Sequence, residues 1–194
     1  MADYTQGTEE HKLRRAKKMM LWFGIISLSM SFAGWTSAYV VSKERPDWIE
    51  NLQIPTAFIT SLIIILISSL TLHFAKKRIQ KEDHKAGMIL LLVTFALGLA
   101  FIWFQIQGFQ EIIGLFGYNP TGPTSNITYT FIFLIAVVHL AHVIAGLVCL
   151  LVVIFNHSRK KYANGKTLGV ELATTFWHFV DILWIYLLLL FYIA

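Results

Sequence analysis

The sequence has 194 residues, of which 56% are hydrophobic and 14% charged, with a formal net charge of +5. Soluble domains have about 25% charged residues, so an ordinary soluble domain is excluded. Disordered chains are poor in aromatic residues, whereas Phe, Trp and Tyr make up 14% of this sequence. The chain is therefore expected to face lipid.

The predicted membrane spans follow from stretches without Asp, Glu, Lys or Arg. Such stretches cover 19–42, 51–75, 86–110 and 112–158, and a final one over 167–194 contains two acidic residues. A helix that spans a bilayer needs about 20 mostly apolar residues, and a concentration of glycine, proline and asparagine before residue 127 divides the longest stretch. The sequence predicts an all-α integral membrane protein, with one membrane domain over 1–194 and a bundle of five transmembrane helices near 20–41, 54–75, 87–107, 129–155 and 168–193.

Basic residues alternate between the connections of the predicted helices. Residues 1–19, the second loop and the fourth loop together carry 14 of the 16 Lys and Arg residues, and the first loop carries the other two. This distribution is the positive-inside pattern of membrane proteins, and differs from the continuous basic stripe of a nucleic-acid-binding protein. We therefore predict no nucleic-acid partner, a cytoplasmic basic segment over 1–19 and a C-terminus outside, on the periplasmic side.

Polar residues within the predicted spans are concentrated on the last two helices. On an ideal helix, the two histidines of the fourth helix share one face, as do the four polar residues of the fifth. Ionisable groups at membrane depth are costly unless they are paired or functional. The candidate polar network consists of His139, His142, Glu171, Thr174, His178 and Asp181. His142 and Asp181 have similar predicted depths, so they could meet, and an ionised Asp181 would need His142 or His178 as its partner.

Residue types leave three interpretations of this set open. His178 with His139 or His142 could hold a haem b, because membrane cytochromes bind haem between imidazoles of two helices. The same side chains could instead form a hydrogen-bonded network that packs the helices, with Gly146 allowing close approach. A third interpretation is the proton relay of a small proton-coupled transporter.

Other polar and aromatic residues are expected to have ordinary roles. Gln105 lies near the outer end of the third span and is expected to be hydrated, and the loop residues His84 and His157 are expected to be solvated. Trp177 is close enough to a span end to fit an interfacial anchor. Cys149 is the single cysteine, which excludes an internal disulfide and a multi-cysteine metal site.

Sequence motifs in the later helices carry a family resemblance. The fifth span reads WHFVDILW over 177–184, from Trp177 to Trp184, with Glu171 six residues before the first tryptophan. The fourth reads HLAHVIAG over 139–146, and the third reads LGLAFIWFQ over 97–105. The second closes with SSLT over 68–71. These motifs, in this order, resemble the cytochrome c oxidase subunit III family in its five-helix bacterial form.

The sequence also departs from that family at particular positions. Leu28 follows Ser27 where the family has a glutamate, and Gly108 occupies the place of another expected glutamate. No role of those carboxylates can be transferred to this chain. The mitochondrial form has two further helices before the first span, and we expect extra helices of the catalytic subunit or a neighbouring respiratory complex to cover the corresponding surface.

The resemblance implies the non-catalytic subunit III of a haem-copper terminal oxidase, which reduces O₂ to water with electrons from cytochrome c or quinol while pumping protons. It places haem and copper in partner subunits and implies no catalytic, cofactor-binding or metal-binding residue on this chain. It implies oxidase subunits I and II, membrane phospholipids and a larger respiratory supercomplex as partners, in the bacterial cytoplasmic (inner) membrane. The chain would stabilise the catalytic subunit, bind lipid and sustain turnover, with the polar set serving that architecture.

The charge distribution generates a topology prediction. A reporter fused after Ala194 should be active outside the membrane, and one placed in the loop over 76–85 should be active in the cytoplasm, because basic loops stay inside. Paired reporters that respond on opposite sides at the two positions measure this directly. The reverse pattern would contradict the predicted orientation.

Overall fold

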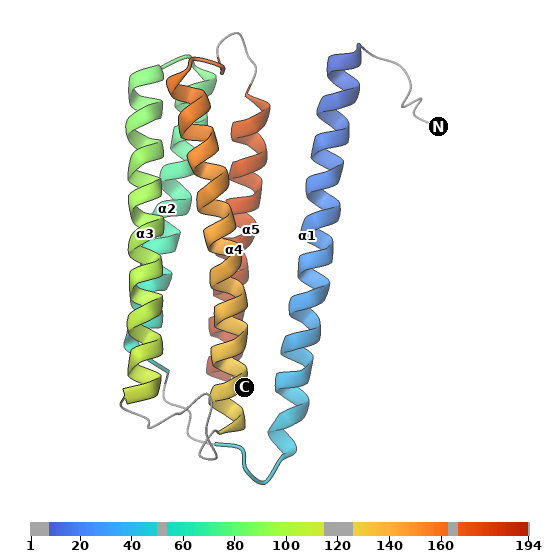
Figure 1. The fold of residues 1–194 in the computed structure, drawn as a ribbon, viewed down its shortest axis with the longest axis vertical. Helices are drawn as coiled ribbons and strands as arrows, with labels where there is room; N and C mark the ends of the chain where they lie inside the picture. The colour runs from blue at the N-terminus through green and yellow to red at the C-terminus, as the bar shows by residue number, and fades with distance from the viewer. Residues whose placement is uncertain (1–7, 50–53, 115–125, 163–166, 194) are drawn as a thin grey trace.

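The structure is a computed structural model that describes residues 8–49, 54–114, 126–162 and 167–193. Regular structure in these ranges is entirely helical. The elements are α1 (Glu9–Val41), the short 3₁₀ helix η1 (Ser42–Glu44), α2 (Thr56–Gln80), α3 (His84–Gly114), α4 (Ile127–Ser158) and α5 (Leu168–Ile193). Figure 1 shows α2 to α5 side by side and α1 at one edge, with the start of α1 and the end of α5 at opposite ends of the bundle.

The five long helices confirm the predicted architecture, because each is long and apolar enough to cross a membrane. Their ends differ from the predicted spans. α1 begins at Glu9 and not near residue 20, so the second half of the basic segment is helical, and α3 extends at both ends beyond 87–107. Counting uncharged residues finds the part that faces lipid, whereas backbone hydrogen bonds continue a helix into water regardless of charge.

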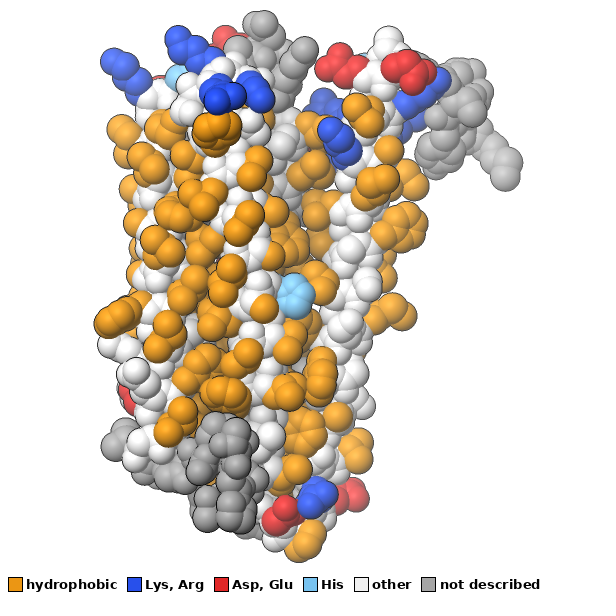
Figure 2. All heavy atoms as spheres, viewed as in Figure 1, with side chains coloured by type: hydrophobic (Ala, Val, Ile, Leu, Met, Phe, Trp, Pro, Cys, Tyr) orange, Lys and Arg blue, Asp and Glu red, His pale blue; other side chains and the backbone are white. Residues whose placement is uncertain are grey.

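Charged side chains are concentrated at the two ends of the bundle. Figure 2 shows a broad hydrophobic zone between them, with most Lys and Arg at the end where α1 begins. We call this end the basic end; α2 and α4 finish there, and α5 begins there. A lipid-facing belt between two polar ends is the surface expected of a membrane bundle.

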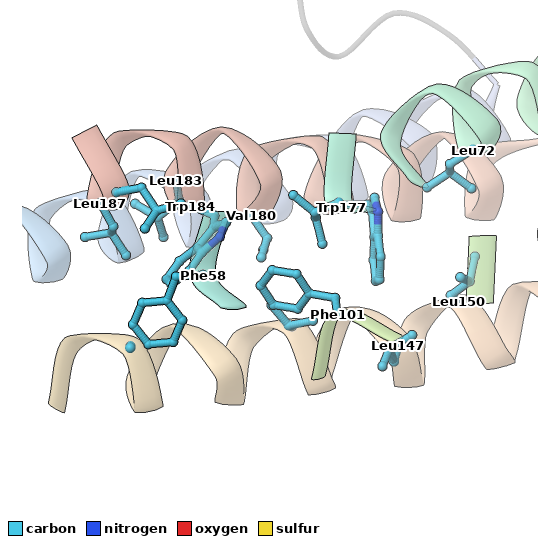
Figure 3. Packing of buried hydrophobic residues seen from close by; sticks show 14 of the residues in the cluster. Phe58, Leu72, Phe101, Leu147, Leu150, Trp177, Val180, Leu183, Trp184 and Leu187 are labelled. Carbon is cyan, nitrogen blue, oxygen red and sulfur yellow. The ribbon is translucent and has the colours of Figure 1, made fainter. Parts of the chain in front are cut away.

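The core is built on two tryptophans of α5. Trp184 meets the Phe58 ring of α2 and the Phe101 ring of α3 edge to face, with centroids 5.5 and 5.8 Å away. Trp177 lies between α3 and α4, where it fills the space that Gly98 and Gly146 leave. Figure 3 shows both indoles pointing into the cluster. Trp177 is therefore buried (2% exposed), which corrects the expectation of an interfacial anchor.

α1 is the least covered of the five helices. Only 17% of its most apolar 18-residue stretch is buried, compared with 44% of the corresponding stretch of α5. Its inward face consists of Ile25, Phe32, Thr36 and Tyr39, and it packs against α4 and α5. The Tyr186 hydroxyl of α5 donates to Thr36 Oγ1 at 3.0 Å. The hydrophobic contact area that holds α1 is thus small, and polar contacts contribute a larger share of its attachment.

Glycine positions provide a test of the packing. A Cβ at Gly98 would lie 2.7 Å from Leu147 Cδ2 and 2.9 Å from the Trp177 ring, so Gly98→Ala should destabilise the protein by about 1–3 kcal/mol through overpacking. Gly34→Ala is the matched control, because no neighbouring atom of the described residues lies within 4 Å of its Cβ position, and it should stay within about 0.5 kcal/mol. Reversible unfolding in detergent measures both. Equal effects would contradict this account.

Candidate functional site

The polar set of α4 and α5 is divided among three environments. Asp181 is buried, and the Nδ1 atom of His178 lies 3.9 Å from its Oδ2. Ser69 of α2 contacts the same ring nitrogen, with Oγ 2.6 Å from Nδ1. The structure therefore brings His178, and not His142, to Asp181. Both residues of this pair are on α5, and their contact with another helix is with Ser69 of α2 and not with α4.

The histidines of α4 lie in aromatic surroundings. His139 is completely buried, and its ring stacks on Trp184 with centroids 5.0 Å apart and planes 16° apart. Neither of its ring nitrogens has a hydrogen-bond partner in the described residues. His142 donates from Nδ1 to the Val138 carbonyl at 2.7 Å, and its ring meets Phe32 of α1. These imidazoles act as packing groups between α1, α4 and α5.

Glu171 joins the start of α5 to α1. Its Oε1 accepts from Arg14 at 2.7 Å, and its Oε2 lies 2.8 Å from Lys18 Nζ. Thr167 also donates to Oε1 at 3.1 Å. The glutamate side chain is 15% exposed, whereas the cations are 42% and 45% exposed. One carboxylate thus anchors two turns of α1 at the basic end.

Thr174, the remaining member of the set, makes a local contact. Its Oγ1 donates to the Val170 carbonyl at 2.7 Å, one turn earlier on α5. The hydroxyl is satisfied within its own helix. It therefore links none of the three environments to another.

A second polar cluster connects α2, α3 and α5 deep in the bundle. Gln105 is 1% exposed and its Nε2 donates to Ser61 Oγ at 3.1 Å. Trp184 Nε1 donates to the same oxygen at 3.2 Å, and that hydroxyl in turn donates to the Phe58 carbonyl. The expectation of a hydrated Gln105 is therefore wrong. Position near a span end does not decide burial, because α3 continues three turns beyond residue 104 and this face is covered by α2.

The two histidines expected in loops, His84 and His157, lie in α3 and α4 and are less solvated than expected. His157 is 3% exposed, donates from Nε2 to the His84 carbonyl at 3.0 Å and stacks near Tyr162. The rings of His84 and His157 have centroids 5.5 Å apart. Burial raises the pKa of the Tyr162 phenol, which a hydrogen bond with Asn156 opposes. These contacts join the end of α4 and Tyr162 to the start of α3.

Sequence reasoning missed the partners of the polar set. Ser69, Arg14 and Lys18 supply its contacts, and Ser61 joins Gln105 to Trp184. Serine in a helix and cations at a membrane surface are common and carry no local signal. The serines within SSLT over 68–71 offered the nearest hint. A partner is decided by which helix faces lie together, and helical periodicity does not determine that arrangement.

The arrangement does not fit a haem held between two of these imidazoles. His139 faces Trp184, His142 faces α1, and His178 faces α2, so no two of them point into a shared cavity. Within the described ranges, no group of three or more His, Cys, Asp or Glu side chains is placed to hold a metal ion. What the site offers chemically is a buried carboxyl beside an imidazole.

Comparison with known sequences gives a consistent result. The family model described as Cytochrome c oxidase subunit III matches residues 6–194. The chain is 30% identical to the cytochrome c oxidase subunit 3 of Thermostichus vulcanus over 176 residues, which cover 87% of this chain and 83% of that protein. It is 26% identical to cytochrome c oxidase subunit 3 of Alkalihalophilus pseudofirmus, with coverage of 98% and 95%.

A quinol oxidase subunit is also among the relatives. The chain is 25% identical to the cytochrome bo(3) ubiquinol oxidase subunit 3 of Buchnera aphidicola over 181 residues, which cover 90% of this chain and 85% of that protein. A subunit of a cytochrome c oxidase and a subunit of a ubiquinol oxidase thus both match over nearly the whole chain.

The contacts of Glu171 generate a prediction about α1. Glu171→Gln should weaken the attachment of its N-terminal turns by about 1 kcal/mol, because half-exposed cations make salt bridges of modest strength. Amide hydrogen exchange over 14–20 should then be about fivefold faster. Glu9→Gln is the matched control, because Glu9 pairs with Lys12 on the same exposed helix surface. Equal acceleration in both variants would show that Glu171 does not hold α1.

Proposed function

Because this chain belongs to the cytochrome c oxidase subunit III family, we propose that it is the non-catalytic helical subunit of a haem-copper terminal oxidase. In this role it binds the catalytic subunit I and subunit II in a bacterial cytoplasmic membrane. The haem and copper that reduce O₂ lie in those partners. The complex takes electrons from cytochrome c or quinol and pumps protons.

The single observation that carries the non-catalytic role is the separation of the three mid-membrane histidines. A bis-imidazole haem site needs two rings that face one plane from opposite helices. Here His139 is stacked on Trp184, His142 is directed at Phe32 and His178 contacts Ser69. Each ring thus faces a different neighbour, which supports a use of the histidines other than haem ligation.

A lipid-binding role is supported by apolar spaces on both sides of α1. A cavity of about 570 Å³ opens between α1, α2 and α5 at the end opposite the basic end, lined by side chains such as Ile59, Leu188 and Ile193. A second, of about 470 Å³, lies between α1, α4 and α5 and is lined by residues including Leu21 and Phe176. Both are large enough for part of an acyl chain. We include phospholipid that fills these spaces in the proposed function.

The proposal is tested by purifying the oxidase complex with and without this chain. Haem and copper per catalytic subunit should be unchanged, and initial O₂ consumption should remain near that of the complete complex. Activity should then decay faster over repeated turnover in the complex that lacks the chain, and adding the chain back should restore its persistence. Loss of one haem equivalent, or an immediate loss of electron transfer, would overturn the non-catalytic assignment.

A further inference from the structure

The Asp181 carboxyl is buried beside His178 and Ser69. Its side chain is 3% exposed, and neither oxygen has a hydrogen-bond partner in the described residues. An ionised carboxylate in this situation is strongly disfavoured unless a cation offsets it. With His178 Nδ1 at 3.9 Å, the pair is electrically neutral when it holds one exchangeable proton, either on the carboxyl or as imidazolium beside carboxylate.

α2 supplies the connection between this pair and the basic end. Ser69 contacts His178, and the His73 ring lies one turn further along α2, with its centroid 6.3 Å from that of His178. At 1.5 Å per residue, His73 lies about 10 Å from the end of α2, and Asp181 lies about 20 Å from the start of α5. The three titratable side chains therefore form a line from the basic end to the middle of the bundle.

His73 lies where the lipid-facing surface of α2 approaches the basic end. It is exposed, with the apolar side chains Leu70 and Phe74 beside it and Lys76 and Lys77 close by. The ring is therefore within reach of water at that end of the bundle. Its separation from His178 is one that a single water molecule can bridge.

Other charged and titratable groups face this line from the packed helices. On α2, Lys76 and Lys77 lie close to His73. At the start of α5, Glu171 is bound by the α1 cations Arg14 and Lys18. From α4, His139 and His142 face aromatic rings. The carboxylate closest to the pair along α5 is thus already paired, and Asp181 and His178 remain the groups that can exchange a proton.

We propose that His178 and Asp181 form a proton-binding site within the bundle that exchanges its proton with water at the basic end through His73. The charge distribution predicts that this water is cytoplasmic. The proposed site consists of residues of this chain alone. The proposal is the same whether the oxidase takes electrons from cytochrome c or from quinol.

The transfer is balanced in protons and charge. His73 takes a proton from bulk water on one ring nitrogen and releases one from the other to the bridging water, which passes a proton to His178. Imidazolium at His178 then gives its Nδ1 proton to Ser69 Oγ, 2.6 Å away, as the serine hydroxyl releases its own proton to Asp181. The pair changes from a net charge of −1 to 0, and the reverse sequence releases the proton.

Infrared spectroscopy of the intact oxidase complex tests the site. A pH step should produce a protonated-carboxyl C=O band that disappears in Asp181→Asn, which keeps the size of the side chain. The band should shift in D₂O as its proton exchanges. A band that is present but unchanged across the pH range would overturn the proposal, because the carboxyl would then keep one protonation state. The absence of any band that depends on Asp181 would overturn it as well.

The route is tested by two histidine variants. His73→Gln should slow the D₂O shift of the Asp181 band by about tenfold or more while the complex stays assembled. His11→Gln is the matched control, because His11 is an exposed histidine of α1 at the same end of the bundle, and it should leave the exchange rate unchanged. Equal rates in wild type and His73→Gln would show that the proton does not pass through His73.

Discussion

Trp184 is the side chain on which the packing of four helices depends. Its indole touches α2 through Phe58, α3 through Phe101 and α4 through the stacked ring of His139. Its N–H reaches Ser61, where the amide of Gln105 also donates. Within lipid there is little hydrophobic force between helices, so close packing and hydrogen bonds of this kind decide which helices associate. One residue therefore satisfies both requirements at the centre of the bundle.

α1 is held by both aromatic and polar contacts. It meets the bundle through the rings of Phe32 and Tyr39, through the hydroxyl of Thr36 and through the two cations that bind Glu171. None of these contacts includes Trp184. The bundle thus combines a four-helix core fixed by aromatic packing with a fifth helix attached near its ends and its middle, and apolar spaces remain on both sides of that helix.

The sequence was sufficient for the fold and insufficient for the contacts of the site. Five spans could be predicted because lipid imposes a length and an apolar composition on each helix separately. The burial of Gln105 and Trp177 could not be predicted, because it depends on which neighbouring helix covers a helix face. Trp177 fits only because Gly98 and Gly146 on two other helices lack side chains. Likewise, depth along a helix placed His142 and Asp181 at one level, but rotation of α5 directs Asp181 and His178 towards Ser69 on α2.

The contacts of α1 also set an order for assembly during synthesis. α1 packs against α4 and α5, the last two helices to be made, and Arg14 is separated from Glu171 by 157 residues. At about 5–20 residues per second, this separation corresponds to on the order of 10–30 s of translation. During that interval the first helix resides in the bilayer without its intramolecular neighbours, while α2 and α3 can already pair. The nascent subunit therefore exposes the Phe32 face of α1 to lipid, to insertion factors or to other oxidase subunits until its final helix enters the membrane.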